Sequence, residues 1–134
     1  YDELGLSHVR VSDFIEDMAH EIRTAHLVMG RSGATTVAEL AAVGRAAYFI
    51  PFPFAADDHQ AANARSLVDC GAARMIREKD IDIDAWATEL TMILSDADLL
   101  GQMSQEARNR GVPEAATYIV EDLIDISSNR KERC

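Results

Sequence analysis

The stretch Gly30-Arg31-Ser32-Gly33-Ala34-Thr35-Thr36-Val37-Ala38-Glu39 decides how this chain folds. The apolar run at residues 26–29 precedes it and predicts a short buried strand, and apolar residues at helical spacing follow from Val37 to Gly44. A strand, a tight turn of small residues and a helix start together leave backbone N–H groups and the positive end of a helix dipole pointing at a possible anion. The alternative is an ordinary strand–helix turn with a solvated Glu39.

The side chains of this turn suit a nucleotide. Ser32, Thr35 and Thr36 offer hydroxyl groups, and Gly33 lets the backbone approach a ligand closely. Glu39 lies one turn into the predicted helix, too far along to cap it. Its carboxylate can accept hydrogen bonds from the two hydroxyls of a ribose.

Length and composition limit the possible functions. The 134 residues are enough for one domain with a single core, so we expect residues 1–134 to form one domain. The net charge of −10 argues against a nucleic-acid surface, which needs clustered lysine and arginine. Cys70 and Cys134 make neither a disulfide framework nor a metal-ligand spacing, which favours a reducing compartment and no metal. The first residue is Tyr rather than Met, so we expect a piece of a longer protein.

The pattern along the chain predicts strands that alternate with helices. Strands are expected at residues 8–11, 26–30, 47–50 and 73–76. Helices are expected to start at Ser12 or Asp13, near Thr36, at Asp57 or Asp58, at Asp82 or Asp84, at Asp96 or Asp98, and at Pro113. This alternation predicts an α/β fold with a parallel sheet, in which ligands bind outside the carboxyl ends of the strands. Three loops meet that rule, namely residues 11–15, 30–36 and 51–60.

Two of the predicted helices are expected to bury one apolar side each. For the first helix the buried residues are Phe14, Met18, Ile22 and Ala25. For the last helix they are Ala116, Ile119, Val120 and Leu123.

Four blocks of the sequence resemble the MurG family of glycosyltransferases. They are FIEDM at 14–18, RSGATTVAE at 31–39, PFP at 51–53 and DHQAANA at 58–64, and together they make residues 11–76 similar to the family. The resemblance implies an inverting enzyme of peptidoglycan synthesis that moves N-acetylglucosamine from its UDP donor onto a lipid-linked muramyl-pentapeptide. It also implies a Rossmann-like parallel sheet with flanking helices, as part of the C-terminal domain of a GT-B glycosyltransferase.

The resemblance further implies a donor site for UDP-N-acetylglucosamine. Ile15 would meet the uracil edge through its backbone, and Glu39 would take the ribose hydroxyls. The loop near the diphosphate and the sugar would consist of Arg31, Ser32, Gly33, Ala34, Thr35 and Thr36. The N-acetylglucosamine would be contacted by His59, Gln60 and Asn63. A structural pairing role for Arg31 and a helix-start role for His59 are the alternatives.

Some features of the family are missing from this sequence. Phe54 stands where many members have His, and Ala46 stands where Pro is common. This sequence has no Gly-Gly-Ser phosphate loop, and by the resemblance we expect it to be the later half of the donor-binding domain, without the first part of that domain and without the acceptor-binding N-terminal domain. We therefore expect the catalytic base and the lipid acceptor site to lie on that other domain, at the inner face of the cell membrane. The resemblance implies no cofactor, and the chain alone is expected to be inactive and to self-associate through an exposed sheet edge.

Two other interpretations stay open from the sequence. One is a non-catalytic UDP-sugar-binding subunit that needs a partner. The other is a related UDP-N-acetylglucosamine enzyme such as a 2-epimerase. Asp57 and Asp58 are the only acid/base candidates for that chemistry, and helix capping explains them more simply.

Overall fold

A three-stranded parallel sheet forms the centre of the computed structural model, which describes residues 5–6, 8–55 and 58–131. The strands are β1 (Val28–Gly30), β2 (Ala47–Phe49) and β3 (Ala73–Met75), in the order β1-β2-β3. All three residues of the central strand β2 are buried. This fits its apolar run without alternation, which is typical of a parallel strand covered on both faces.

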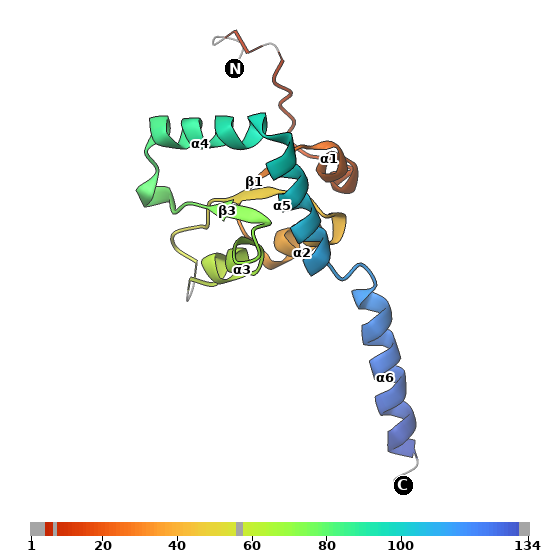
Figure 1. The fold of residues 1–134 in the computed structure, drawn as a ribbon. Helices are drawn as coiled ribbons and strands as arrows, with labels where there is room; N and C mark the ends of the chain where they lie inside the picture. The colour runs from red at the N-terminus through yellow and green to blue at the C-terminus, as the bar shows by residue number, and fades with distance from the viewer. Residues whose placement is uncertain (1–4, 7, 56–57, 132–134) are drawn as a thin grey trace.

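Helices cover both faces of the sheet. The helices α2 (Ala34–Val43) and α3 (His59–Val68) connect the strands and lie on one face, while α4 (Ile83–Ser95) lies along the other (Figure 1). The helix α5 (Ala97–Arg110) crosses the edge of the molecule and contributes to the cores on both faces. The fold is therefore the α/β sheet with flanking helices that the sequence predicts.

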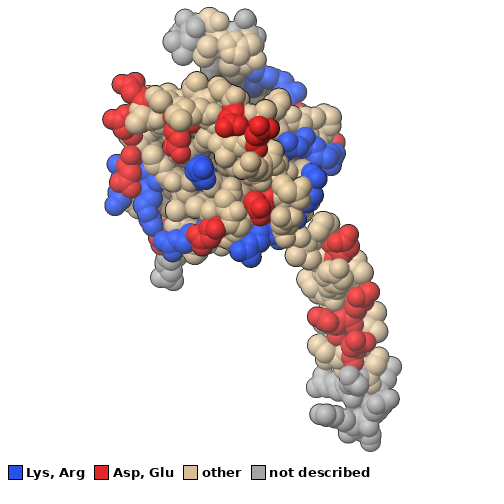
Figure 2. Space-filling view, in the orientation of Figure 1, with Lys and Arg blue, Asp and Glu red and all other residues tan. Residues whose placement is uncertain are grey.

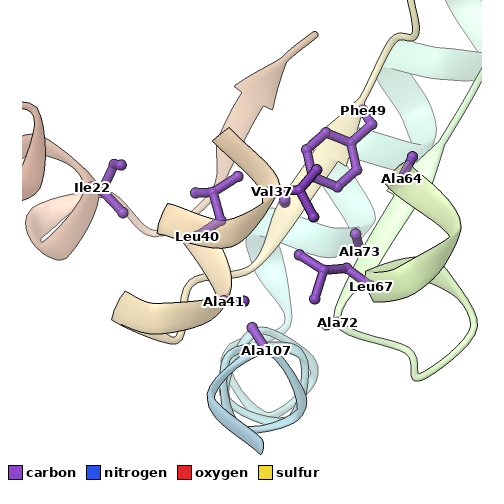
Figure 3. Close-up of a cluster of buried hydrophobic side chains, with 11 residues drawn as sticks. Ile22, Val37, Leu40, Ala41, Phe49, Ala64, Leu67, Ala72, Ala73 and Ala107 are labelled. Carbon is purple, nitrogen blue, oxygen red and sulfur yellow. The ribbon is translucent and has the colours of Figure 1, made fainter. Parts of the chain in front are cut away.

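The main core lies between the sheet, α2, α3 and α5. Its largest buried side chains are Leu40, Phe49 and Leu67, which Figure 3 shows gathered with Ala107 of α5. Full burial of such an apolar side chain contributes about 1.5 to 3 kcal/mol. Small residues at Ala107 and Gly111 allow α5 to lie close to α2. This packing holds α2 in place, and the N-terminus of α2 forms part of the candidate site.

The predicted ends of several elements are confirmed. Gly44 ends α2 in the left-handed conformation with φ of 72°. Asp82 caps α4, because its carboxylate accepts a bond of 2.9 Å from the amide of Ala85. Asp96 caps α5 in the same way through the amide of Leu99, also at 2.9 Å. Local chemistry alone determines these ends.

The predictions for the N-terminal segment are wrong. Residues 8–11, which the structure describes, form no strand, so the sheet has three strands in the described part of the chain rather than four. The helix α1 (Met18–Thr24) begins later than expected, with Asp17 as its cap. Phe14 is 78% exposed and Met18 46%, and Ile22 alone is buried within α1. A short β-branched run is a weak strand signal, and residues 8–11 make no ladder with either edge of the sheet.

The last helix, α6 (Ala115–Lys131), extends away from the rest of the molecule (Figure 1). The side that the sequence marks as buried is exposed in this chain, with Ile119, Val120 and Leu123 between 54% and 60% accessible. Figure 2 shows acidic side chains along the same helix. Within the described residues, no helix is both long and apolar enough to cross a membrane.

Candidate functional site

Ser32 joins the two loops that follow β1 and β2. Its side chain is fully buried, and its hydroxyl donates a hydrogen bond of 2.8 Å to the backbone carbonyl of Gln60 at the start of α3. The side-chain amide of Asn63 donates in return to the backbone carbonyl of Ser32, at 3.2 Å. These two bonds connect residues 28 and 31 positions apart in the sequence. The starts of α2 and α3 are therefore held together at the carboxyl ends of β1 and β2.

Arg31 extends from the first loop across the second. Its Nη1 donates to the carbonyls of Ile50 and Pro51, at 3.1 and 3.0 Å. Its Nη2 donates to the carboxylate of Glu78 at 2.8 Å, and its guanidinium carbon lies 5.5 Å from the centre of the Phe52 ring. These contacts give Arg31 the pairing role that the sequence left as an alternative. Its contact with a donor stays a prediction.

The start of α2 can receive an anion. Gly33 is the N-cap residue and has an extended backbone, and it makes no side-chain capping bond. The N–H groups of residues 34–36 therefore have no helical or capping acceptor, and the helix dipole adds partial positive charge at the same end. Ala34 and Thr35 are exposed and Thr36 is half-buried. Glu39 is exposed one turn further along α2, where a carboxylate can reach hydroxyl groups beside a bound phosphate.

Gln60 carries two hydrogen bonds that hold the second loop. Its backbone carbonyl accepts from Ser32, and its side-chain Oε1 accepts from the backbone amide of Phe52 at 2.9 Å. The side-chain nitrogen of Gln60 is then the group that can donate to a sugar hydroxyl. His59 precedes Gln60 in the sequence and is exposed at the first position of α3.

Ile15 lies in a different hollow. The cavity that it lines has a volume of about 340 Å³ and is formed by residues 10–21 among those described. Ile15 is 38% exposed, and an ion pair between Arg10 and Glu21 closes the same segment. Because residues 8–11 form no strand, residues 11–15 do not follow a strand end as expected. Hydrogen bonds thus join the loops at 31–36 and 59–63, while Ile15 lines a hollow formed by its own segment.

Sequence reasoning missed Arg77 and its pairing with Asp58 at this site. Two bonds of 3.1 and 2.5 Å run from the Arg77 guanidinium to the Asp58 carboxylate. The hydrogen bonds from Arg77 also hold the pKa of the Asp58 carboxyl below its usual range. Asp58 does not cap α3 with its side chain, so that expectation is wrong, and Asp57 lies outside the described residues. The available signal was the pair of opposite charges Arg77-Glu78, two residues after the end of β3.

The described residues hold no group of three or more His, Cys, Asp or Glu side chains that could bind a metal ion. The polar groups at the site that are not paired with another side chain include the backbone N–H donors at the start of α2, the carboxylate of Glu39 and the side-chain nitrogen of Gln60. Such groups recognise phosphates and hydroxyls, the chemistry of a nucleotide sugar.

A parallel sheet whose strand-end loops surround a free helix N-terminus defines the class of α/β ligand-binding domains. Comparison with known proteins then places the chain within that class. The chain belongs to the glycosyltransferase family 28 C-terminal domain family, whose model matches residues 1–119.

Two curated relatives show the similarity. Each has the name UDP-N-acetylglucosamine--N-acetylmuramyl-(pentapeptide) pyrophosphoryl-undecaprenol N-acetylglucosamine transferase. The chain is 44% identical over 126 residues to the relative from Nitratidesulfovibrio vulgaris strain DP4, covering 94% of this chain and 34% of that protein. It is 41% identical over 128 residues to the relative from Sinorhizobium fredii, covering 96% and 34%. The chain therefore spans about a third of the length of these relatives.

A solved structure agrees with the fold. The crystal structure of Acinetobacter baumannii MurG matches with a TM-score of 0.79 and 41% identity, over 87% of this chain and 34% of that one. The glycotransferase of kitacinnamycin matches with a TM-score of 0.62 at 24% identity, which supports the fold alone. The predicted family resemblance and fold class are both confirmed.

Proposed function

We propose that this chain is the donor-binding part of an N-acetylglucosaminyltransferase that uses UDP-N-acetylglucosamine and a lipid-linked muramyl-pentapeptide. The relatives named for that transferase support it, since they are 44% and 41% identical to nearly the whole chain. The structural observation that carries it is the pair of loops joined by Ser32 and Asn63 beside the free N-terminus of α2.

We propose a role for each part of the site. Transfer breaks the bond between the anomeric carbon of the sugar and the terminal phosphate oxygen of UDP, so negative charge develops on the diphosphate. The free N–H groups at residues 34–36 stabilise that charge, because they are fixed before the reaction begins. Glu39 accepts the ribose hydroxyls, and Gln60 and His59 contact the sugar. Ile15 contacts the uracil, which requires the segment at 10–21 to border the same ligand.

We propose that the remaining steps use parts of the protein outside this chain. The chain would form the later half of the donor-binding domain, over residues 1–134, and the acceptor site and the base that takes the acceptor proton would lie in the rest of the protein. The names of the relatives specify an undecaprenol-linked acceptor, which is a lipid. The enzyme would then act as a peripheral protein at the inner face of the cell membrane.

We also propose that the isolated chain self-associates. The strands β1 and β3 are both sheet edges, and the apolar side of α6 is exposed. Unpaired edges and exposed apolar surface favour contact between copies.

The test of donor binding is the variant Glu39→Ala, with titrations of UDP and of UDP-N-acetylglucosamine. Charge-assisted hydrogen bonds contribute about 1.5 to 3 kcal/mol each, so both ligands should bind at least about tenfold more weakly. The matched control is Glu106→Ala on α5, which removes the same charge from an exposed position away from the site. Unchanged affinity in Glu39→Ala would contradict the ribose role.

A second test asks whether the chain alone catalyses transfer. Orientation of donor against acceptor supplies a large part of a transfer rate, so the chain alone should bind UDP and show no transfer. Rapid transfer by this chain alone would contradict the proposal that the acceptor site lies elsewhere.

A further inference from the structure

Two consecutive residues of opposite charge follow β3 and reach two different loops of the site. Arg77 forms an ion pair with Asp58, in the loop before α3, at 2.5 Å. Glu78 forms an ion pair with Arg31, in the loop after β1, at 2.8 Å. The two pairs span 19 and 47 positions of sequence. One short segment thus connects all three strand ends of the sheet.

We propose that Arg77 and Glu78 are positioning residues that hold the two donor-site loops at a fixed separation. The expected effect on donor binding rests on the proposed function. The positioning of the loops rests on the two ion pairs alone. We call the four side chains Arg31, Asp58, Arg77 and Glu78 the loop clip.

The Arg77 half of the loop clip acts on a strained residue. Asp58 has a φ of 54°, and it is the only residue other than glycine with a positive φ among those described. A left-handed backbone is unfavourable for a residue with a Cβ atom, so the surroundings must maintain it. The two parallel bonds from Arg77 to the carboxylate supply a planar, directional restraint. Gln60 follows two residues later, so the restraint at Asp58 sets where α3 begins.

The Glu78 half acts through Arg31. Glu78 accepts from one guanidinium nitrogen, which leaves the other nitrogen directed at the carbonyls of Ile50 and Pro51. Those carbonyls lie directly before Phe52, whose amide donates to the Gln60 side chain. Loss of Glu78 would leave the Arg31 guanidinium held only by those carbonyls and by the Phe52 ring, so the restraint on the turn after β2 would weaken.

Because the two ion pairs are partly exposed, we expect them to affect the position of the loops more than the stability of the whole domain. The side chains of both ion pairs are between 39% and 50% exposed, and exposed pairs contribute little to the stability of a whole domain. We therefore expect the loop clip to change the mobility of the loops while leaving the melting temperature nearly unchanged.

The first experiment measures hydrogen exchange of the Phe52 amide in the 134-residue chain, without ligand. In Arg77→Met and in Glu78→Gln we expect exchange to rise by about threefold to tenfold, since local opening depends on local restraints. The control is Lys79→Met. It removes the same charge as Arg77→Met, from an exposed position two residues further along the chain. Exchange at the parent rate in both clip variants would overturn the proposal.

A second set of variants separates the ion pair from backbone strain. Asp58→Gly removes the strain and the pair together, and Asp58→Asn keeps the shape of the side chain without its charge. If the loop clip positions the loop, both variants raise exchange at Phe52. A slower exchange in Asp58→Gly than in the parent would mean that strain alone governs the loop, and it would overturn the proposal. Arg77→Lys should give an intermediate rate, because lysine keeps the charge but not the paired geometry.

Donor titration then tests the functional consequence. Arg77→Met should weaken UDP-N-acetylglucosamine by about fivefold more than it weakens UDP, because Asp58 adjoins the residues assigned to the sugar. Equal losses for the two ligands would overturn the role in sugar positioning. If the parent chain binds neither ligand, the proposed function fails, while the exchange rates still decide whether the loop clip exists.

Discussion

Replacing Ser32 with alanine removes the hydrogen bond that connects the two loops of the candidate site. The hydroxyl is fully buried and donates to the carbonyl of Gln60 at 2.8 Å. That carbonyl keeps the bond from the amide four residues later in α3, so no acceptor is left unsatisfied. The loss is then that of one buried hydrogen bond and a small void, about 1 to 2 kcal/mol.

Thermal unfolding measures this effect directly. For a domain of this size, a loss of about 1 to 2 kcal/mol lowers the melting temperature by roughly 3 to 8 °C. Circular dichroism at a fixed chain concentration gives the value, and urea titration checks that the slope of the unfolding transition is unchanged. Ser32→Ala should also weaken UDP-N-acetylglucosamine, because the start of α3 loses its anchor to the first loop.

A second serine in the same region provides the control. Ser66 donates to the carbonyl of Asn63 at 2.7 Å, but the bond is exposed and lies within one helix. Ser66→Ala should change the stability by less than about 0.5 kcal/mol. The reasoning would be refuted if Ser32→Ala were as stable as the parent, or if both variants lost the same stability.

Three further predictions concern other parts of the molecule. Gln60→Ala should weaken UDP-N-acetylglucosamine more than UDP in calorimetric titrations, and equal losses would leave Gln60 only its role in holding the loop. Burial, and then the hydrogen bond donated to a carboxylate of α4, raise the pKa of the Tyr48 hydroxyl well above its ordinary value of 10.0. The folded chain therefore keeps a proton that the unfolded chain releases, so stability should be full below about pH 10 and fall above it. Tyr48→Phe should flatten that fall in urea titrations from pH 9 to 11. Gly111→Ala should destabilise the domain by about 1 to 3 kcal/mol, because the added Cβ would clash with the backbone of Ala41. Gly101→Ala, within α5, meets open space and should instead stabilise the domain by about 0.5 to 1 kcal/mol, as melting curves would show.

Expectations that depended on long-range packing failed at the two ends of the chain. The residues from Phe14 to Ile22 have helical apolar spacing, yet the helix begins only at Met18 and Ile22 alone within it is buried. The sequence of α6 likewise has apolar residues at helical spacing, but they are exposed in this chain. Periodicity shows which side of a helix can be buried. It does not show which surface covers that side, because the partner lies elsewhere in space.

The sequence by itself determined the elements whose cause is local. The turn at residues 30–36, the stop at Gly44, the caps at Asp82 and Asp96 and the buried strand β2 all follow from side chains within a few positions of one another. The family resemblance, likewise, lies in short blocks that can be read in order.

Only the tertiary structure decided which polar groups of the site are already used by the fold. Arg31, Ser32 and Asn63 looked like ligand contacts in the sequence, and each bonds to the other loop or to the segment after β3. The sequence did not predict the pairing of Asp58 with Arg77. These partners are 19 to 47 residues apart along the chain. They meet because the parallel strand order brings three strand ends to one edge of the sheet, and local sequence patterns do not encode that order.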